Sequence, residues 1–158
     1  MLDRLVQTLK VNMAGLIKKV EVSGREIYID ISAENIHEAC MFVYANIDCA
    51  LLSLFANDER AISGSFCVYY SFTVKNAGAL LTLRTYIPEA GAVLPSISGE
   101  MPAASLYERE ITDMFGISFE GHPDMKELVF HGNWPEGLHP LRKEFKTSEK
   151  PAFTRREQ

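Results

Sequence analysis

Three carboxylates surround an arginine in the second half of the chain, where Glu108, Glu110 and Asp113 flank Arg109. Carboxyl groups gathered in this way can act as a general acid and a general base. On a helix, Arg109 and Asp113 would lie four residues apart, a spacing that allows a direct ion pair. We interpret the cluster as a structural ion-pair network. The alternative is a stand-alone acid/base enzyme that uses Glu108, Glu110 or His122.

Other patterns of catalytic or ligand-binding residues find no support in the sequence. The histidines His122, His131 and His139 are widely spaced in segments rich in Gly and Pro, without the helical pair typical of zinc sites. Ser63-Gly64-Ser65 does not match the Gly-x-Ser-x-Gly elbow of a nucleophilic serine. The glycines form neither a Walker loop nor a dinucleotide fingerprint. We therefore expect no catalytic, cofactor-binding or metal-binding residues in this chain.

The cysteines argue against an iron–sulfur cluster held by this chain alone. Cys40, Cys49 and Cys67 include no closely spaced pair, whereas clusters and structural zinc are usually held by such pairs. Each cysteine lies among apolar neighbours. We expect three small buried thiols.

Composition and charge exclude several classes of protein. The chain of 158 residues has the size of one domain, and its apolar fraction of 47% is that of a folded protein. A net charge of -5 argues against nucleic-acid binding, because phosphate affinity comes from clustered Lys and Arg. No apolar run reaches the length of a transmembrane helix, and the N-terminus does not resemble a signal peptide. We expect a cytoplasmic location.

Apolar periodicity predicts helices and strands in the first part of the chain. Residues 2–9 carry apolar side chains at helical spacing, which predicts a short amphipathic helix against a sheet. Residues 20–22 and 26–31 read as a hairpin that turns at Ser23-Gly24-Arg25. Ser32 could cap a following helix whose apolar spacing continues to Ile47.

The middle of the chain contains a second predicted hairpin. Residues 51–55 are apolar, and their pattern leaves both helix and strand open. Residues 66–74 alternate between two faces, and a second run follows at 80–87 after a turn. Glycines and prolines then predict a loop over residues 88–101, before a last helix that has Pro102 near its first turn.

This order of elements indicates an α+β fold. We expect a two-layer domain with the order α-β-β-α-β-β(-β) and a mixed, largely antiparallel sheet over residues 1–120. From residue 121, glycines and prolines interrupt every regular element although large apolar side chains remain. We therefore predict an irregular C-terminal extension over residues 121–158 that binds a partner and is less ordered in the isolated chain.

Two motifs resemble a known family. The run Glu-Arg-Glu-Ile-Thr-Asp-Met-Phe-Gly-Ile-Ser-Phe-Glu-Gly-His-Pro-Asp, residues 108–124, closely resembles the signature of the thirty-kilodalton subunit family of respiratory complex I. The later run His-Pro-Leu-Arg-Lys-Glu-Phe, residues 139–145, resembles the closing motif of that family. The family includes the equivalent subunit of energy-converting membrane-bound hydrogenases and formate hydrogenlyase.

The resemblance implies a subunit without an active site of its own, in the hydrophilic arm of a complex I-like NADH-quinone oxidoreductase or a membrane-bound hydrogenase. It implies that the chain braces a large hydrogenase-like (49 kDa-type) subunit and a small iron–sulfur (20 kDa-type) subunit. The iron–sulfur clusters would lie in those partners, and this chain would bind no cofactor. Such a subunit is peripheral to the inner membrane and touches it only through the complex.

The same resemblance assigns the motif residues to the fold and to a partner interface. Arginines offer planar charged groups to partner carboxylates, and Trp and Phe side chains offer large apolar anchors. The residues so assigned are Glu108, Arg109, Glu110, Asp113, Phe115, Gly116, His122, Pro123, Trp134, His139, Pro140, Leu141, Arg142, Lys143 and Phe145.

Some residues depart from the family pattern. Lys126 stands where the family has an arginine, and residues 134–139 are more similar to the hydrogenase branch. These departures leave the electron donor and acceptor open. Because the chain ends soon after the second motif, we expect a free-standing subunit and not a fusion to the large subunit.

Overall fold

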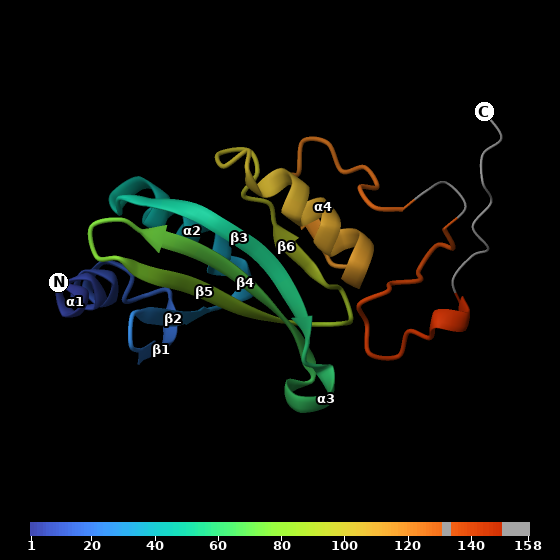
Figure 1. Cartoon of the computed structure of the whole chain (residues 1–158), viewed down its shortest axis with the longest axis horizontal. Coiled ribbons are helices and arrows are strands. Elements are labelled where there is room, and N and C mark those ends of the chain that lie inside the picture. The colour runs from blue at the N-terminus through green and yellow to red at the C-terminus, as the bar shows by residue number, and fades with distance from the viewer. Residues whose placement is uncertain (131–133, 150–158) are drawn as a thin grey trace.

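A computed structural model describes residues 1–130 and 134–149 of the chain. The fold is α+β with a mixed, mostly antiparallel sheet, as the sequence predicts (Figure 1). Its elements in chain order are α1 (Leu2–Asn12), β1 (Ile17–Ser23), β2 (Glu26–Ile31), the 3-10 turn η1 (Ala33–Asn35), α2 (Ile36–Asn46), β3 (Cys49–Asp58), α3 (Arg60–Ser63), β4 (Ser65–Val74), β5 (Ala79–Pro88), β6 (Val93–Pro95), α4 (Ala104–Phe115), β7 (Ser118–Glu120) and the 3-10 turn η2 (Thr147–Glu149).

The main sheet has five strands in the order β1-β2-β5-β4-β3. The two predicted hairpins, β1–β2 and β4–β5, are antiparallel, and β2 joins β5 in parallel between them. Residues 51–55, which the pattern left open, belong to the edge strand β3. The alternation of Ile27, Ile29 and Ile31 with polar residues directs one face of β2 into the core.

Helices α1 and α2 complete the core on one side of this sheet. Val6 and Leu9 of α1 and Cys40 and Val43 of α2 are buried in the same apolar cluster as the isoleucines of β2. The predicted helix after Ser32 begins with a 3-10 turn, and α2 starts only at Ile36. In Figure 1, α2 lies behind the sheet, and α1 lies at the end of the molecule away from α4.

A second, smaller layer corrects the prediction of a plain loop over residues 88–101. Within that segment β6 pairs in parallel with β7, which follows α4. Each of these strands has only three residues, too short for a recognisable alternation. Helix α4 packs beside the edge strand β3, and the Tyr107 hydroxyl donates to the Leu52 carbonyl there at 3.3 Å.

The C-terminal extension has little regular structure in its described part, which contains only the turn η2. It nevertheless touches the core at several places along α4, described below. The division of the chain at residue 120, into a core domain and a partner-binding extension, therefore stays a prediction. None of the helices in residues 1–130 and 134–149 combines the length and the apolar content that crossing a bilayer requires.

Candidate functional site

Glu108 lies in the buried face of α4. Ala104, Glu108, Ile111 and Phe115 recur at helical spacing, and all four are buried. The Ser96 hydroxyl donates to Glu108 Oε2 at 2.6 Å, and the Ile97 amide donates to Oε1 at 2.8 Å. Burial raises the pKa of Glu108, because desolvation disfavours the charged carboxylate. Its hydrogen bonds join α4 to the chain that leaves β6.

His122 is the buried neighbour of Glu108, with its Nε2 3.9 Å from Glu108 Oε2. The Asp124 amide donates to His122 Nδ1 at 3.0 Å, so Nε2 carries the proton in the neutral ring. Nε2 then faces the carbonyl of Ser105 at 3.2 Å. Because both the His122 and the Glu108 side chains have 0% exposure, this acid–base pair lies beyond the reach of a substrate.

Arg109 and Asp113 do not form the ion pair that their spacing predicts, so this prediction is wrong. Arg109 instead donates from Nε to the Lys126 carbonyl at 2.8 Å and from Nη2 to the Glu127 carbonyl at 3.0 Å. Asp113 Oδ2 accepts the amides of residues 128 and 129, each at 2.8 Å. Both side chains bind the main chain of residues 122–130, which we call the strap. The strap follows α4 from Ser105 to Asp113.

The second motif caps the C-terminal end of α4. The last carbonyls of a helix have no partner within the helix, and those of residues 113–115 are bound here by the extension. His139 Nδ1 donates to the Asp113 carbonyl at 2.8 Å, and the Leu141 amide donates to the Met114 carbonyl at 3.1 Å. Arg142 Nε donates to the Phe115 carbonyl at 2.8 Å. The two family motifs therefore meet within this chain.

Gly116 makes this close contact possible. It ends α4 in the left-handed region, with φ +74°. A Cβ at this position would collide with the His139 imidazole and would lie 2.8 Å from Arg142 Nη2. The geometry thus requires glycine for its backbone conformation and also for its missing side chain.

Asp58, at the end of β3, anchors the next part of the extension. Its side chain is 1% exposed and accepts Arg60 Nη2 at 2.7 Å and the Lys143 amide at 2.8 Å. Hydrogen bonds from the Arg60 guanidinium, the largest cause, hold the pKa of Asp58 well below its usual range. Asp58 is therefore ionised while it binds the second motif.

Arg60 and Arg142 share partners next to this anchor. Each donates to Glu89 at 2.8 Å, and Arg60 also pairs with Glu144. Their guanidinium carbons lie 4.7 and 5.3 Å from the centre of the Phe66 ring. Arg142, which we predicted to meet acids on a partner, is only 18% exposed and is bound within the chain.

The large aromatic side chains of the extension stack on one another. The ring of Trp134 lies 4.4 Å from that of Phe130 and 6.4 Å from that of Phe145. Trp134 Nε1 also donates to the Leu138 carbonyl at 2.7 Å. Trp134 and Phe145, which the sequence predicts as partner anchors, are both partly buried in this arrangement, as is Phe130.

The other predicted site residues divide between core and surface. Phe115 is buried and meets Phe66 edge to face at 6.2 Å. Pro140 is partly buried, while the side chains of Glu110, Pro123 and Lys143 are exposed. Asp58, Arg60 and Glu89 were not singled out from the sequence. Asp58 and Lys143 are 85 residues apart, so no local pattern could have connected them.

The described residues contain no grouping of three or more His, Cys, Asp or Glu side chains that could hold a metal ion. His131, one of the histidines considered above, lies outside the described residues. Cys40 and Cys67 are buried as predicted, and Cys49 is partly buried. Burial raises the pKa of the Cys67 thiol to about 11.

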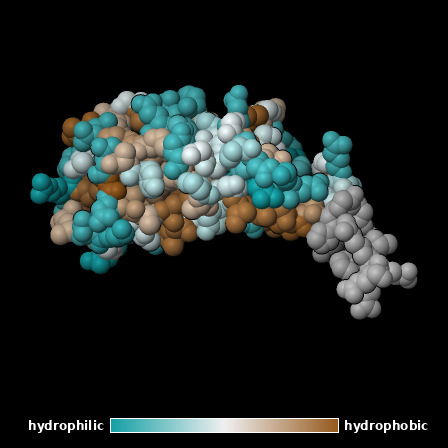
Figure 2. All heavy atoms as spheres, turned by 90° about the horizontal axis from the view of Figure 1, so that it is seen from above, coloured by the Kyte–Doolittle hydropathy of each residue, from teal (hydrophilic) through white to brown (hydrophobic). Residues whose placement is uncertain are grey.

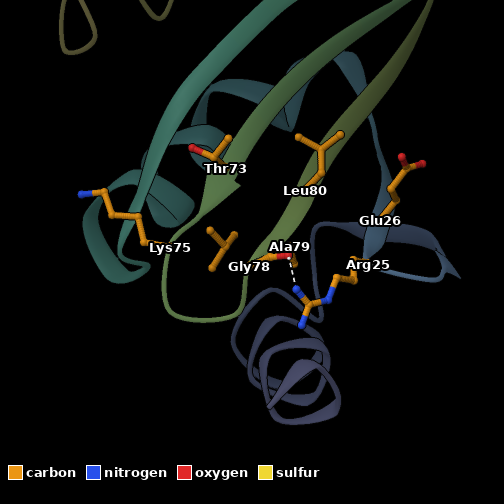
Figure 3. Close-up of a pocket in the computed structure, with 8 residues that line it drawn as sticks. Arg25, Glu26, Thr73, Lys75, Gly78, Ala79 and Leu80 are labelled. Carbon is orange, nitrogen blue, oxygen red and sulfur yellow. Dashed lines mark hydrogen bonds between the residues drawn. The ribbon is translucent and has the colours of Figure 1, made fainter.

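A shallow hollow lies near the β4–β5 turn (Figure 3). This turn is at the end of the sheet away from α4 (Figure 1). Arg25 crosses it and donates to the Gly78 carbonyl at 3.4 Å, while Thr73, Lys75 and Leu80 form its other walls. None of the motif residues lines this hollow. The residues with chemical potential gather around α4 instead.

Comparisons with family models, with other protein sequences and with solved structures agree on one family. Residues 29–151 match the family described as respiratory-chain NADH dehydrogenase, 30 Kd subunit. The chain is 31% identical to hydrogenase-4 component G of Escherichia coli over 90% of its length and spans 26% of that protein. It is 32% identical to the C-type subunit of NADH-quinone oxidoreductase from Ruegeria pomeroyi, covering 89% of this chain and 70% of that one.

A third relative is the C/D-type subunit of NADH-quinone oxidoreductase from Methylococcus capsulatus, 40% identical over 60% of this chain and 17% of its own length. The chain therefore spans only a minor part of component G and of the C/D-type protein. Among solved structures, a chain of the archaeal membrane-bound sulfane sulfur reductase has the same fold, with TM-score 0.81 and 24% identity over 92% of this chain and 85% of that chain. The Nqo5 fragment 1–134 matches with TM-score 0.65 and 26% identity, over 78% and 98% of the two chains.

Proposed function

Because this chain belongs to the respiratory-chain NADH dehydrogenase 30 Kd subunit family, we propose that it is a structural subunit of a complex I-like oxidoreductase and has no active site of its own. It would hold the neighbouring subunits of the hydrophilic arm in place for electron transfer. This role covers both branches of the family, since relatives carry NADH-quinone oxidoreductase and hydrogenase names.

The proposal rests on which groups the side chains of the motif residues bind. Arg109, Asp113, His139 and Arg142 bind main-chain groups of this same chain, and none of the four lines the hollow near the β4–β5 turn. Such contacts shape a surface, whereas catalytic groups must reach a substrate. The same geometry weighs against the acid/base enzyme, because Glu108 and His122 are closed off from solvent.

The proposed partner is a large hydrogenase-like protein, which we call the D-type subunit. The name of the Methylococcus capsulatus relative joins the C and D types in one polypeptide, and this chain matches only 17% of that protein. Two units found in one polypeptide are held near each other, which supports direct contact between their separate counterparts. A small iron–sulfur subunit is the second proposed partner. The clusters would belong to the partners, and the chain would be peripheral to the membrane through them.

The proposal is tested by co-expressing the tagged chain with a D-type subunit from the same organism. We expect the two to co-purify as a stable one-to-one complex, and the isolated chain to contain no stoichiometric iron or zinc. A chain that never co-purifies with such a partner, or that alone turns over a substrate through Glu108, would overturn the proposal. Glu108→Gln separates true turnover from a contaminant.

A further inference from the structure

The strap turns its main chain inward and its apolar side chains outward. Two of its carbonyls are bound by Arg109 and two of its amides by Asp113. The side chains on the same stretch remain open to solvent: Met125 is 40% exposed, Leu128 39% and Val129 47%. This arrangement holds apolar side chains rigidly at the surface of α4.

Two further exposed apolar residues flank the strap. Leu106 stands three residues before Arg109 on α4 and is 58% exposed. Leu141 is 54% exposed, and its amide is fixed to the Met114 carbonyl at 3.1 Å. We call these five residues, Leu106, Met125, Leu128, Val129 and Leu141, the apolar strip. In the space-filling view, brown clusters of hydrophobic side chains interrupt the hydrophilic surface in several places, most clearly along the lower edge (Figure 2).

The way the strap is bound limits how a partner can recognise it. An added β-strand would need free amides and carbonyls, and four of these groups are already occupied by Arg109 and Asp113. What remains available is the apolar side chains themselves. A surface of this kind fits burial against apolar side chains of another protein.

Two acidic side chains beside the apolar strip are open to a partner. Glu110 and Glu127 are exposed, and within the described residues neither forms an ion pair. The cations nearest these two glutamates are already engaged, since Lys126 pairs with Asp124 at 2.8 Å and Arg109 binds carbonyls, whereas Lys143 is exposed beyond the Leu141 end of the strip. Charge complementarity therefore favours a partner segment that carries Lys or Arg beside its apolar residues.

We propose that the apolar strip is the surface on which the D-type subunit docks, through an apolar segment flanked by Lys or Arg. This inference rests on the proposed function and adds to it the side of the chain that meets the partner. The polar motif residues then act from within, because Arg109 and Asp113 hold the strap in the shape that the partner recognises.

The test compares two identical substitutions at exposed valines. Val129→Asp lies in the apolar strip, and Val11→Asp lies on α1, which is at the other end of the molecule (Figure 1). Affinity for the purified D-type subunit is measured by biolayer interferometry. We expect Val129→Asp to weaken binding by about 100-fold, because a charge is forced into an apolar contact, and Val11→Asp to change it less than about twofold.

Two companion measurements keep the result interpretable. Circular dichroism and thermal melting of the Val129→Asp chain should match the wild type, since the side chain is half exposed and its amide still binds Asp113. Glu110→Lys should slow association about tenfold at low salt, and this effect should fade at high salt.

The outcomes separate the two proposals. If the wild type binds the D-type subunit and Val129→Asp binds equally tightly, the strip is not the interface, although the proposed function stands. If the wild type does not bind at all, the proposed function itself fails. A wild-type chain that dimerises on size-exclusion chromatography with light scattering, and that Val129→Asp makes monomeric, would show that the strip serves self-association instead.

Discussion

Replacing Gly116 with alanine tests whether the two family motifs lock together within the chain. The substitution has two costs. The first is the left-handed backbone at φ +74°, which costs a non-glycine residue about 1 kcal/mol. The second is the collision of the new Cβ with His139 and Arg142. Moving these side chains would break the hydrogen bonds they donate to the carbonyls of residues 113 and 115.

The structure supplies a matched control for the first cost. Gly64 also ends a helix, with φ +75°, and a Cβ there would meet no atom within 4 Å. Gly64→Ala should therefore cost only about 1 kcal/mol of unfolding free energy. Gly116→Ala should cost about 2–4 kcal/mol, because the loss of two hydrogen bonds, one from a charged donor, adds about 1–3 kcal/mol.

Both variants are measured by urea denaturation with two probes. Circular dichroism follows the core, and fluorescence follows Trp134, the single tryptophan of the chain, which lies in the extension. Gly116→Ala should shift the Trp134 emission before the core unfolds, and Gly64→Ala should not. Equal losses of stability in the two variants, with unchanged tryptophan emission, would refute the contact between Gly116 and the second motif.

Three further predictions concern the charged side chains. Arg109→Ala should lower the free energy of unfolding by about 1–2 kcal/mol through its two carbonyl contacts, while Glu110→Ala at the exposed neighbouring position should change it by under about 0.5 kcal/mol, both in urea titrations. Asp58 has a lowered pKa, so it stabilises the fold above about pH 4 and loses that effect as the pH falls; Asp58→Asn should flatten the acid limb of a stability–pH curve. Glu108 has a raised pKa, so its contribution to stability falls as the pH rises above about 4.3, and Glu108→Gln should remove this decline in the same assay.

The elements that the sequence predicted best are those with an unbroken period. In β4, large apolar residues recur at every second position from Phe66 to Val74, and the β4–β5 hairpin pairs in register from Ser65 with Pro88 to Val74 with Ala79. Strand β3 was left open because its register shifts between Leu51 and Ser53, where the irregularity interrupts the alternation. The three-residue strands β6 and β7 form only because the fold brings them together.

The candidate site shows a different limit of sequence reasoning. Arg109 and Asp113 have the spacing of an ion pair, but the strap offers each of them two main-chain partners that local spacing cannot reveal. Glu108 gave a signal that could have been used, since it occupies the buried stripe of α4 between apolar residues. The family motifs were recognised from sequence, whereas their meeting at Gly116 required the tertiary structure.

The central claim, that this chain is a structural subunit bound to a D-type partner, is tested most directly by native mass spectrometry. The full chain is tagged in its own host, purified gently from detergent-treated membranes and analysed intact. We predict a mass equal to this chain together with one large hydrogenase-like subunit, with an iron–sulfur subunit also retained. Recovery of the tagged chain only as a free monomer would contradict the account. So would normal assembly of the large subunit in cells from which this chain has been deleted.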